Sequence, residues 1–130
     1  MIDHIVVNVR DLKASRRFYD QALAPLGYRL IKEFPGGIGY GMGAKADFWM
    51  MQRAPNSEAV HVAFACGTRS LVDAFHAAAL RAGGKDFGVP GVRTHYHVDY
   101  YGAFVLDPDG NNIEAVCHDS APPSGKRVRT

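Results

Sequence analysis

The 130-residue sequence predicts an α+β protein that contains two copies of a βαβββ module. Two stretches carry the apolar spacing of an amphipathic helix, and short apolar segments bounded by Gly and Pro, typical of strands, surround them. The same pattern returns after 57 residues, and a repeat of that length is typical of a duplicated supersecondary unit. A chain of this length can bury a sizeable core as one domain, which we expect to span residues 1–118.

The first module, residues 1–52, reads as a strand, a helix and three more strands. The segment 2–9 alternates, with Ile5 and Val7 on one face and His4 on the other. A helix follows and ends at Gly27. Its apolar stripe consists of Phe18, Tyr19, Ala22, Leu23 and Leu26. The strands predicted next are 28–33, 38–42 and 47–52, with turns at 35–37 and 43–45.

The second module, residues 58–118, follows a linker at 53–57 and begins with a strand at 61–66. Ser70 and Asp73 have the spacing of a helix N-terminal capping pair, and the helix is expected to end at Gly83 and Gly84. A loop rich in Gly and Pro is predicted before Arg93. The module then closes with a hairpin whose turn is Asp107-Pro108-Asp109-Gly110. Residues 119–130 are predicted to form a flexible tail.

Five pairs of positions match at the 57-residue offset, at the strand start, the helix stripe and the helix end. The pairs are His4 and His61, Phe18 and Phe75, Tyr19 and His76, Leu23 and Leu80, and Gly27 and Gly84. The copies also differ, because Trp49 lies 45 residues after His4 whereas Glu114 lies 53 residues after His61. The eight extra residues fall within 88–101, so this region is expected to distinguish the two modules.

Glu114 is unusual because it stands in the middle of a short predicted strand, where acidic residues are disfavoured. Alternation puts it on one face with Asn112 and Val116, opposite the apolar Ile113 and Ala115. A buried carboxylate must be paired, hydrogen-bonded or bound to a metal. A solvated Glu on an edge strand is the simpler alternative.

Two histidines at equivalent positions complement this carboxylate. His4 and His61 each stand near the start of the first strand of a module. If the modules pack as a pseudo-symmetric pair, both imidazoles and the Glu114 carboxylate can converge in one cavity. Two imidazoles and one carboxylate suit a divalent first-row metal, without choosing between Fe, Mn, Ni, Co and Zn.

The motifs that carry these residues resemble the vicinal oxygen chelate superfamily, which includes glyoxalase I, fosfomycin-resistance thiol transferases, extradiol dioxygenases and bleomycin-resistance proteins. The matching motifs are His4-x-x-x-x-Val9-x-Asp11-Leu12, Phe18-Tyr19, Leu26-Gly27, His61-x-Ala63-Phe64 and Asp107-Pro108-Asp109-Gly110-x-x-x-Glu114. The resemblance spans residues 1–118. It implies that the two modules form a cupped, open-barrel mixed sheet, that His4, His61 and Glu114 bind the metal, and that the protein is a homodimer.

The sequence also departs from members of this superfamily. Glyoxalase I has a fourth metal ligand where this chain has Trp49, so three ligands remain, as in the thiol transferases and the dioxygenases. Against a thiol transferase, the hydroxyl residue two positions after the first His is here Val6. The acid–base pair of a ring-cleaving enzyme could come from His97 and Tyr100, with His95 nearby. Alternation places Trp49 and Phe104 on the wall of the substrate pocket.

Composition narrows the remaining classes of function. The net charge of +2 resides in the segment 119–130, so no basic face for nucleic acid is predicted. No apolar stretch is long enough to span a membrane and no signal peptide is recognised, so a cytoplasmic protein is expected. Cys66 and Cys117 lack metal-ligand spacing and are predicted to be free thiols.

The sequence therefore predicts an enzyme that uses a divalent metal to bind vicinal oxygens of a small molecule, as a lyase or isomerase or as a ring-cleaving dioxygenase. Its metal would stabilise a developing anion. The alternatives are a metal-free binding or resistance protein of the bleomycin-resistance type and a fosfomycin-type thiol transferase. Substrate and reaction type stay open.

Overall fold

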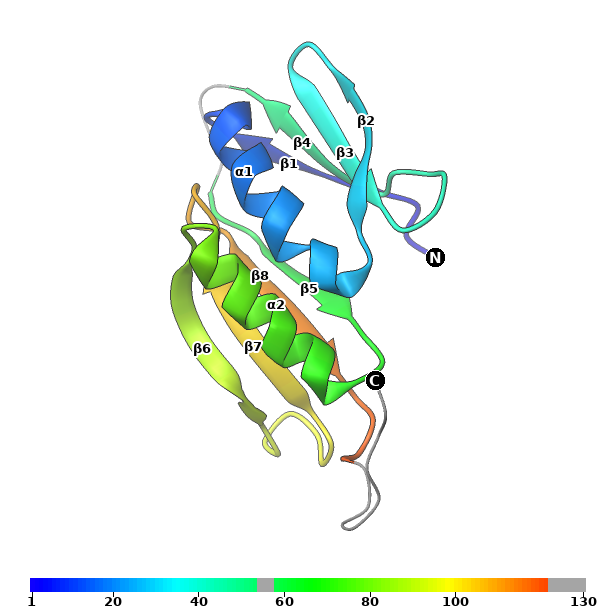
Figure 1. The fold of residues 1–130 in the computed structure, drawn as a ribbon, viewed down its shortest axis with the longest axis vertical. Helices are drawn as coiled ribbons and strands as arrows, with labels where there is room; N and C mark the ends of the chain where they lie inside the picture. The colour runs from blue at the N-terminus through cyan, green and yellow to red at the C-terminus, as the bar shows by residue number, and fades with distance from the viewer. Residues whose placement is uncertain (54–57, 122–130) are drawn as a thin grey trace.

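The computed structural model describes residues 1–53 and 58–121 and contains two four-stranded sheets with two helices against them (Figure 1). The predicted linker at 53–57 and the predicted tail at 119–130 lie largely outside these residues. In chain order the elements are β1 (Ile5–Val9), α1 (Leu12–Ala22), the 3₁₀ helix η1 (Ala24–Leu26), β2 (Arg29–Phe34), β3 (Gly37–Gly41), β4 (Phe48–Gln52), β5 (His61–Ala65), α2 (Arg69–Arg81), β6 (Lys85–Val92), β7 (Tyr101–Leu106) and β8 (Asn112–Cys117).

The two sheets have the same topology. Their strand orders are β1-β4-β3-β2 and β5-β8-β7-β6, and in each sheet the first and last strands of the module pair in parallel while the other pairs are antiparallel. The predicted α+β class with two βαβββ modules is thereby confirmed.

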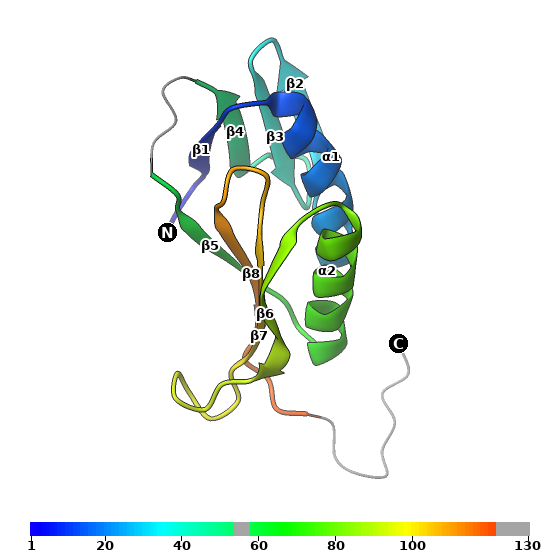
Figure 2. The same cartoon turned by 90° about the vertical axis from the view of Figure 1, so that its left-hand side faces the viewer.

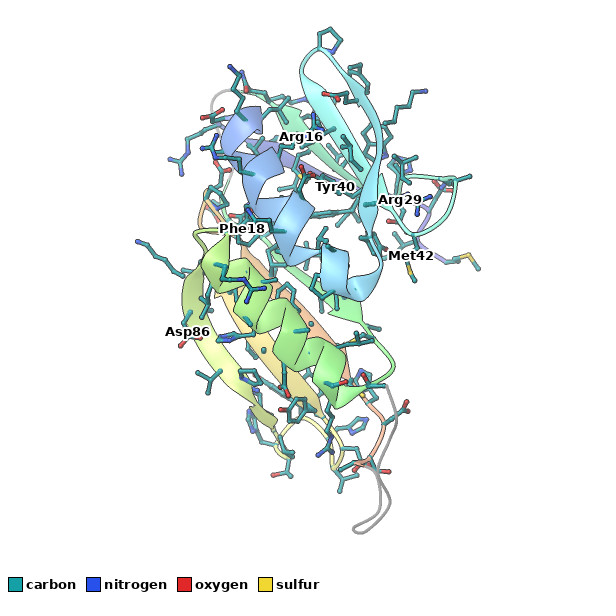
Figure 3. All side chains as sticks on the ribbon, viewed as in Figure 1. Arg16, Phe18, Arg29, Tyr40, Met42 and Asp86 are labelled. Atoms are coloured by element: carbon teal, nitrogen blue, oxygen red, sulfur yellow. The ribbon has the colours of Figure 1, made fainter. Side chains whose placement is uncertain are left out.

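Both α-helices lie on the same side of the two sheets, and no helix of the described residues lies on the opposite side (Figure 2). The core lies between helices and sheets and continues from one module to the other. Phe64 of β5 meets the rings of Phe48 and Tyr28 from the first module, each at a centroid distance of 5.2 Å. Phe18, labelled in Figure 3, is fully buried where α1 and α2 meet. We call the side of the sheets turned away from the helices the open face.

A buried polar contact also joins the modules. The Tyr19 hydroxyl on α1 donates to Asp107 Oδ2 at 2.5 Å, at the turn between β7 and β8. Asp107 Oδ1 accepts the backbone N–H groups of Asp109 and Asn111, so the turn is fixed by its own first carboxylate. The Asp-Pro-Asp-Gly sequence therefore shapes the hairpin and ties it to the other module.

The pairing register supports the alignment of the two copies. Trp49 pairs with Val6 and Gly39, whereas Glu114 pairs with Ala63 and Phe104. Trp49 and Glu114 thus occupy the same place in their sheets. Of the eight extra residues in the second copy, six lie in the connection 93–100, compared with two residues between β2 and β3, and two lengthen β6.

Two predictions about the second module were wrong. Residues 85–92 form strand β6 and not a loop, because its backbone pairs with β7 despite register shifts at Gly88 and Gly91. The helix begins one residue before Ser70, and its N-cap is Thr68, whose hydroxyl accepts the N–H of Leu71 at 3.2 Å.

Cys66 and Cys117 are both free thiols, as predicted. Among residues 1–53 and 58–121, no helix has the length and apolar content needed to cross a membrane.

Candidate functional site

Glu114 is the centre of a polar site on the open face of the second sheet. Its neighbours Ile113 and Ala115 point into the core, so alternation turns the Glu114 side chain to the open face. The side chain is nevertheless only 1% exposed. A carboxylate that is this deeply buried, on the face away from the helices, must be paired or hydrogen-bonded by neighbouring groups.

Two side chains hold it, one on each oxygen. His61 Nε2 donates to Glu114 Oε1 at 2.7 Å, and the Tyr100 hydroxyl donates to Glu114 Oε2. Gly102 makes room for this arrangement, because a Cβ there would lie 3.2 Å from Glu114 Oε2 and 3.1 Å from the Tyr100 ring. The site therefore combines an imidazole, a carboxylate and a phenol from β5, β8 and the segment before β7.

The Tyr100 phenol remains protonated over the physiological range. Burial raises its pKa well above the ordinary value, and the hydrogen bond to the Glu114 carboxylate raises it further. Tyr100 can therefore donate a hydrogen bond or a proton but is a poor base.

His97 lies beside Tyr100, with ring centroids 6.3 Å apart, and is exposed. Its Nδ1 accepts the backbone N–H of Asp99 at 3.2 Å, which places the proton of the neutral ring on Nε2. His118, 5.0 Å from the His97 ring, completes a group of rings at the edge of the site. The structure thus brings together two residues predicted as an acid–base pair.

Phe104 lies against His61, with ring centroids 5.9 Å apart. The guanidinium of Arg93 stacks over the Phe104 ring, with Cζ 4.9 Å from the ring centroid. Phe104 is therefore part of the wall of the site. Sequence reasoning did not identify Arg93 as a site residue. The available signal was its position in the eight-residue insertion.

Asn112 is a second site residue that sequence reasoning did not identify. It pairs with His61 in register and shares the face of Glu114, and its Oδ1 atom is buried without a hydrogen-bond partner among the described residues. The shared alternation with Glu114 was the sequence signal for this position.

Trp49 lies on the open face of the first sheet. Its ring covers Gly39, where a Cβ would approach the ring to 2.7 Å, and it lies 5.8 Å from the Phe34 ring. The first sheet therefore presents an aromatic surface where the second sheet presents Glu114.

His4 lies apart from this polar site, just before β1, with half of its side chain exposed. Its Nδ1 donates to Asp3 Oδ1 at 2.8 Å, and Lys45 Nζ approaches the same oxygen at 2.7 Å. Lys45, and after it His4, lowers the pKa of Asp3. A hollow of about 360 Å³ has both His4 and Trp49 in its wall.

A cleft of about 540 Å³ is lined by residues 2–5, at the start of β1, and by β5, and it has His4 and His61 in its lining. β1 and β5 run in roughly opposite directions, so the starts of the two strands lie apart (Figure 1). Within the described ranges, no three His, Cys, Asp or Glu side chains lie close enough to hold a metal ion.

The donor chemistry of the second sheet nevertheless fits part of a metal site. A buried carboxylate and an imidazole nitrogen in direct contact are two ligands of the kind that divalent first-row metals take. The third predicted ligand, His4, is solvent-accessible, and among residues 1–53 and 58–121 its one hydrogen-bonded side-chain partner is the exposed Asp3.

The fold and site together define a class of protein: paired βαβββ modules with a carboxylate and an imidazole on the helix-free face of the second sheet. The Glyoxalase/Bleomycin resistance protein/Dioxygenase superfamily matches residues 1–115, and this chain belongs to that superfamily. No curated protein matches the chain.

Solved structures agree with this assignment. A glyoxalase/bleomycin resistance protein from Albidiferax ferrireducens T118 is 31% identical, with a TM-score of 0.77 over 88% of this chain and 97% of that chain. A glyoxalase-related enzyme from Fulvimarina pelagi is 20% identical, with a TM-score of 0.70 over 90% and 87%. A lactoylglutathione lyase from Agrobacterium tumefaciens is 17% identical, with a TM-score of 0.68 over 90% and 92%. The last two likenesses concern the fold alone.

Proposed function

We propose that this protein is a divalent-metal-dependent enzyme that acts on a small molecule with vicinal oxygens. The proposed ligands are His61 and Glu114 of one chain and His4 of a second chain in a homodimer. The observation that carries the proposal is the buried Glu114 carboxylate, held between an imidazole and a phenol on the open face. A buried carboxylate in contact with an imidazole supplies two ligands of the kind that a divalent metal takes.

Exposed apolar side chains on the open face support the pairing of two chains. Val6 and Phe34 are 47% and 41% exposed, and Trp49 is half-buried beside them. A second copy that covers this face would bury these groups, and such burial is the main driving force of protein association. In a symmetric dimer of this kind, the first sheet of one chain would face the second sheet of the other, which brings His4 and Trp49 to the Glu114 site.

The site residues would then divide the work. The bound metal would polarise the coordinated oxygens of the substrate. Glu114 and His61 would hold it, and Tyr100, with its raised pKa, would redirect its single hydroxyl hydrogen from Glu114 Oε2 to the substrate oxygen on which negative charge develops. His97, exposed beside Tyr100, would exchange protons with solvent. Trp49 and Phe104 would exclude water from the substrate.

Metal content tests the proposal. We expect protein without a His-tag, incubated with each candidate ion and desalted, to retain about one metal per chain by elemental analysis. His4→Ala, His61→Ala and Glu114→Ala are each expected to lose most of it. His95→Ala is the control, because that side chain contacts only the Tyr96 ring among the described contacts. Wild-type protein that retains no metal would contradict the enzymatic proposal and favour a metal-free binding protein.

A further inference from the structure

Arg93 is a cation on the open face without an acidic partner among the residues described. It is half-buried, yet no carboxylate of the described chain lies within ion-pair distance. Its hydrogen bonds go to three backbone carbonyls instead. Nη1 donates to Gly91 at 3.0 Å and also to Gly102, and Nη2 donates to Val89 at 2.8 Å. Partial charges of carbonyl dipoles orient a guanidinium but do not neutralise its full charge.

The same contacts fix the position of Arg93 next to the Glu114 site. The carbonyls belong to β6, where its register against β7 shifts, and to β7 itself. The guanidinium stacks on the Phe104 ring, and the same ring also contacts the imidazole of His61. The Arg93 charge is also close enough to counteract part of the rise in the Tyr100 pKa that burial causes. Arg93 is thus held by three backbone carbonyls and the Phe104 ring, and Gly102 and Phe104, which it contacts, are neighbours of Glu114 and His61.

The guanidinium keeps donors free for a ligand. It has five N–H groups, and the three hydrogen bonds above leave Nε–H and one Nη2 hydrogen without a partner among the described residues. The buried side-chain nitrogens and oxygens that lack a partner belong, in the same part of the chain, to Ser15, Arg69 and Asn112. Arg93 Nε is not one of them, so it is open to solvent.

The net charge of the metal-loaded site would be positive, which favours an anionic ligand. A divalent metal with two neutral imidazoles and the Glu114 carboxylate has a net charge of about +1, and Arg93 adds a second positive charge. Guanidinium donors match the oxygens of carboxylates and phosphates in geometry and charge.

We propose that Arg93 binds an anionic group of the substrate, a carboxylate, phosphonate or phosphate, while the vicinal oxygens of the same molecule face the metal. This inference rests on the proposed function. It makes the substrate a small anion and Arg93 a determinant of specificity.

NMR titration of the metal-free protein tests the role of Arg93 separately from metal binding. The side-chain Nε–H signals of ¹⁵N-labelled protein are followed in excess chelator while phosphate, acetate or the neutral isostere acetamide is added. Arg93→Lys assigns the Arg93 signal by its disappearance. We expect this signal to shift saturably with phosphate and acetate but not with acetamide.

Arg93→Gln should weaken phosphate binding about tenfold or more, as followed by the backbone signals of Gly102 and Phe104. The matched control Arg81→Gln, on the exposed surface of α2, should bind as the wild type does. If Arg93→Gln fails to fold, the wild-type titration decides, because a purely structural arginine gives no saturable shift. A shift at Arg93 no larger than at other arginines, or equal binding by Arg93→Gln, would overturn the inference. If the wild-type protein binds the anion at Arg93 but retains no metal, the result would instead count against the proposed function.

Discussion

At the scale of single residues, the site depends on how two neighbours divide the oxygens of Glu114. His61 contacts one oxygen and Tyr100 the other, and the absence of a side chain at Gly102 lets the phenol reach in. Trp49 occupies the equivalent place in the first sheet and has neither a charge nor an acceptor. One duplicated position thus carries the candidate chemistry in one copy and an aromatic surface in the other.

Substitution of Tyr19 tests the hydrogen bond to Asp107 that joins the two modules. Tyr19→Phe removes the donor to Asp107 while the ring stays, and both side chains are buried, so the free energy of unfolding should fall by about 1–3 kcal/mol. Urea unfolding monitored by circular dichroism measures the change. Tyr96→Phe is the control, because Tyr96 is 57% exposed and makes ring contacts. Equal stability of the two variants would show that the buried contact contributes nothing.

The raised pKa values of two other tyrosines, Tyr28 and Tyr101, predict how the free energy of unfolding depends on pH. Burial, followed by hydrogen bonds to Asp47 and Asp73, raises the pKa values of Tyr28 and Tyr101 from 10.0 to about 12. The folded state therefore binds these protons more tightly than the unfolded state. Their contribution is fully present below pH 10 and is lost as the pH rises through about 12.

Urea unfolding at a series of alkaline pH values measures this loss. We expect Tyr28→Phe and Tyr101→Phe to reduce the slope of stability against pH above pH 10. An unchanged slope in both variants would contradict the assignment of these groups.

At the scale of elements, β3 shows how glycines shape the open face. Gly37 and Gly39 lie under Phe34, Met51 and Trp49, whose side chains occupy the space that Cβ atoms would fill. Strand glycines often mark close approach of another group. Here the approaching groups are the Phe34 and Trp49 rings and the Met51 thioether, which form the surface of the first sheet.

Gly39→Ala tests this arrangement, because its Cβ would lie 2.7 Å from the ring of the only tryptophan in the chain. Trp49 should move outward, with emission at longer wavelength and stronger acrylamide quenching, and stability should fall by about 1–3 kcal/mol. Gly43→Ala should change neither property, since a Cβ there meets nothing within 4 Å. Unaltered fluorescence in Gly39→Ala would contradict the packing of Trp49 on β3.

The elements also show what sequence patterns can predict. The 57-residue repeat and strand alternation sufficed for the two modules and for the face shared by His61 and Glu114, because both follow from local periodicity. Strand β6 did not follow, since Gly88, Pro90 and Gly91 read as a loop and form a strand only because β7 supplies partners. Arg93 was missed because the position of its guanidinium depends on the carbonyls of Val89 and Gly91, where the register of β6 against β7 shifts.

At the scale of the whole molecule, the two sheets differ in what their open faces offer. The second sheet presents His61, Glu114 and Tyr100, and the first presents Trp49 and Phe34, with His4 at its end. In the described part of the chain, the helices cover the other side of both sheets and leave the open faces accessible to another molecule or a ligand (Figure 2). A symmetric dimer would give each Glu114 site the complementary face of the partner.

Subunit mixing tests most directly the central claim that two chains build each metal site. His4→Ala and His61→Ala chains carry two different histidine-free tags, are expressed together, and the mixed dimer is isolated through both tags. Each pure variant should retain almost no metal. The mixed dimer should retain about one metal per two chains, because the intact His4 of one chain meets the intact His61 and Glu114 of the other. A mixed dimer as poor in metal as the pure variants, from a wild type that binds metal fully, would contradict the shared site.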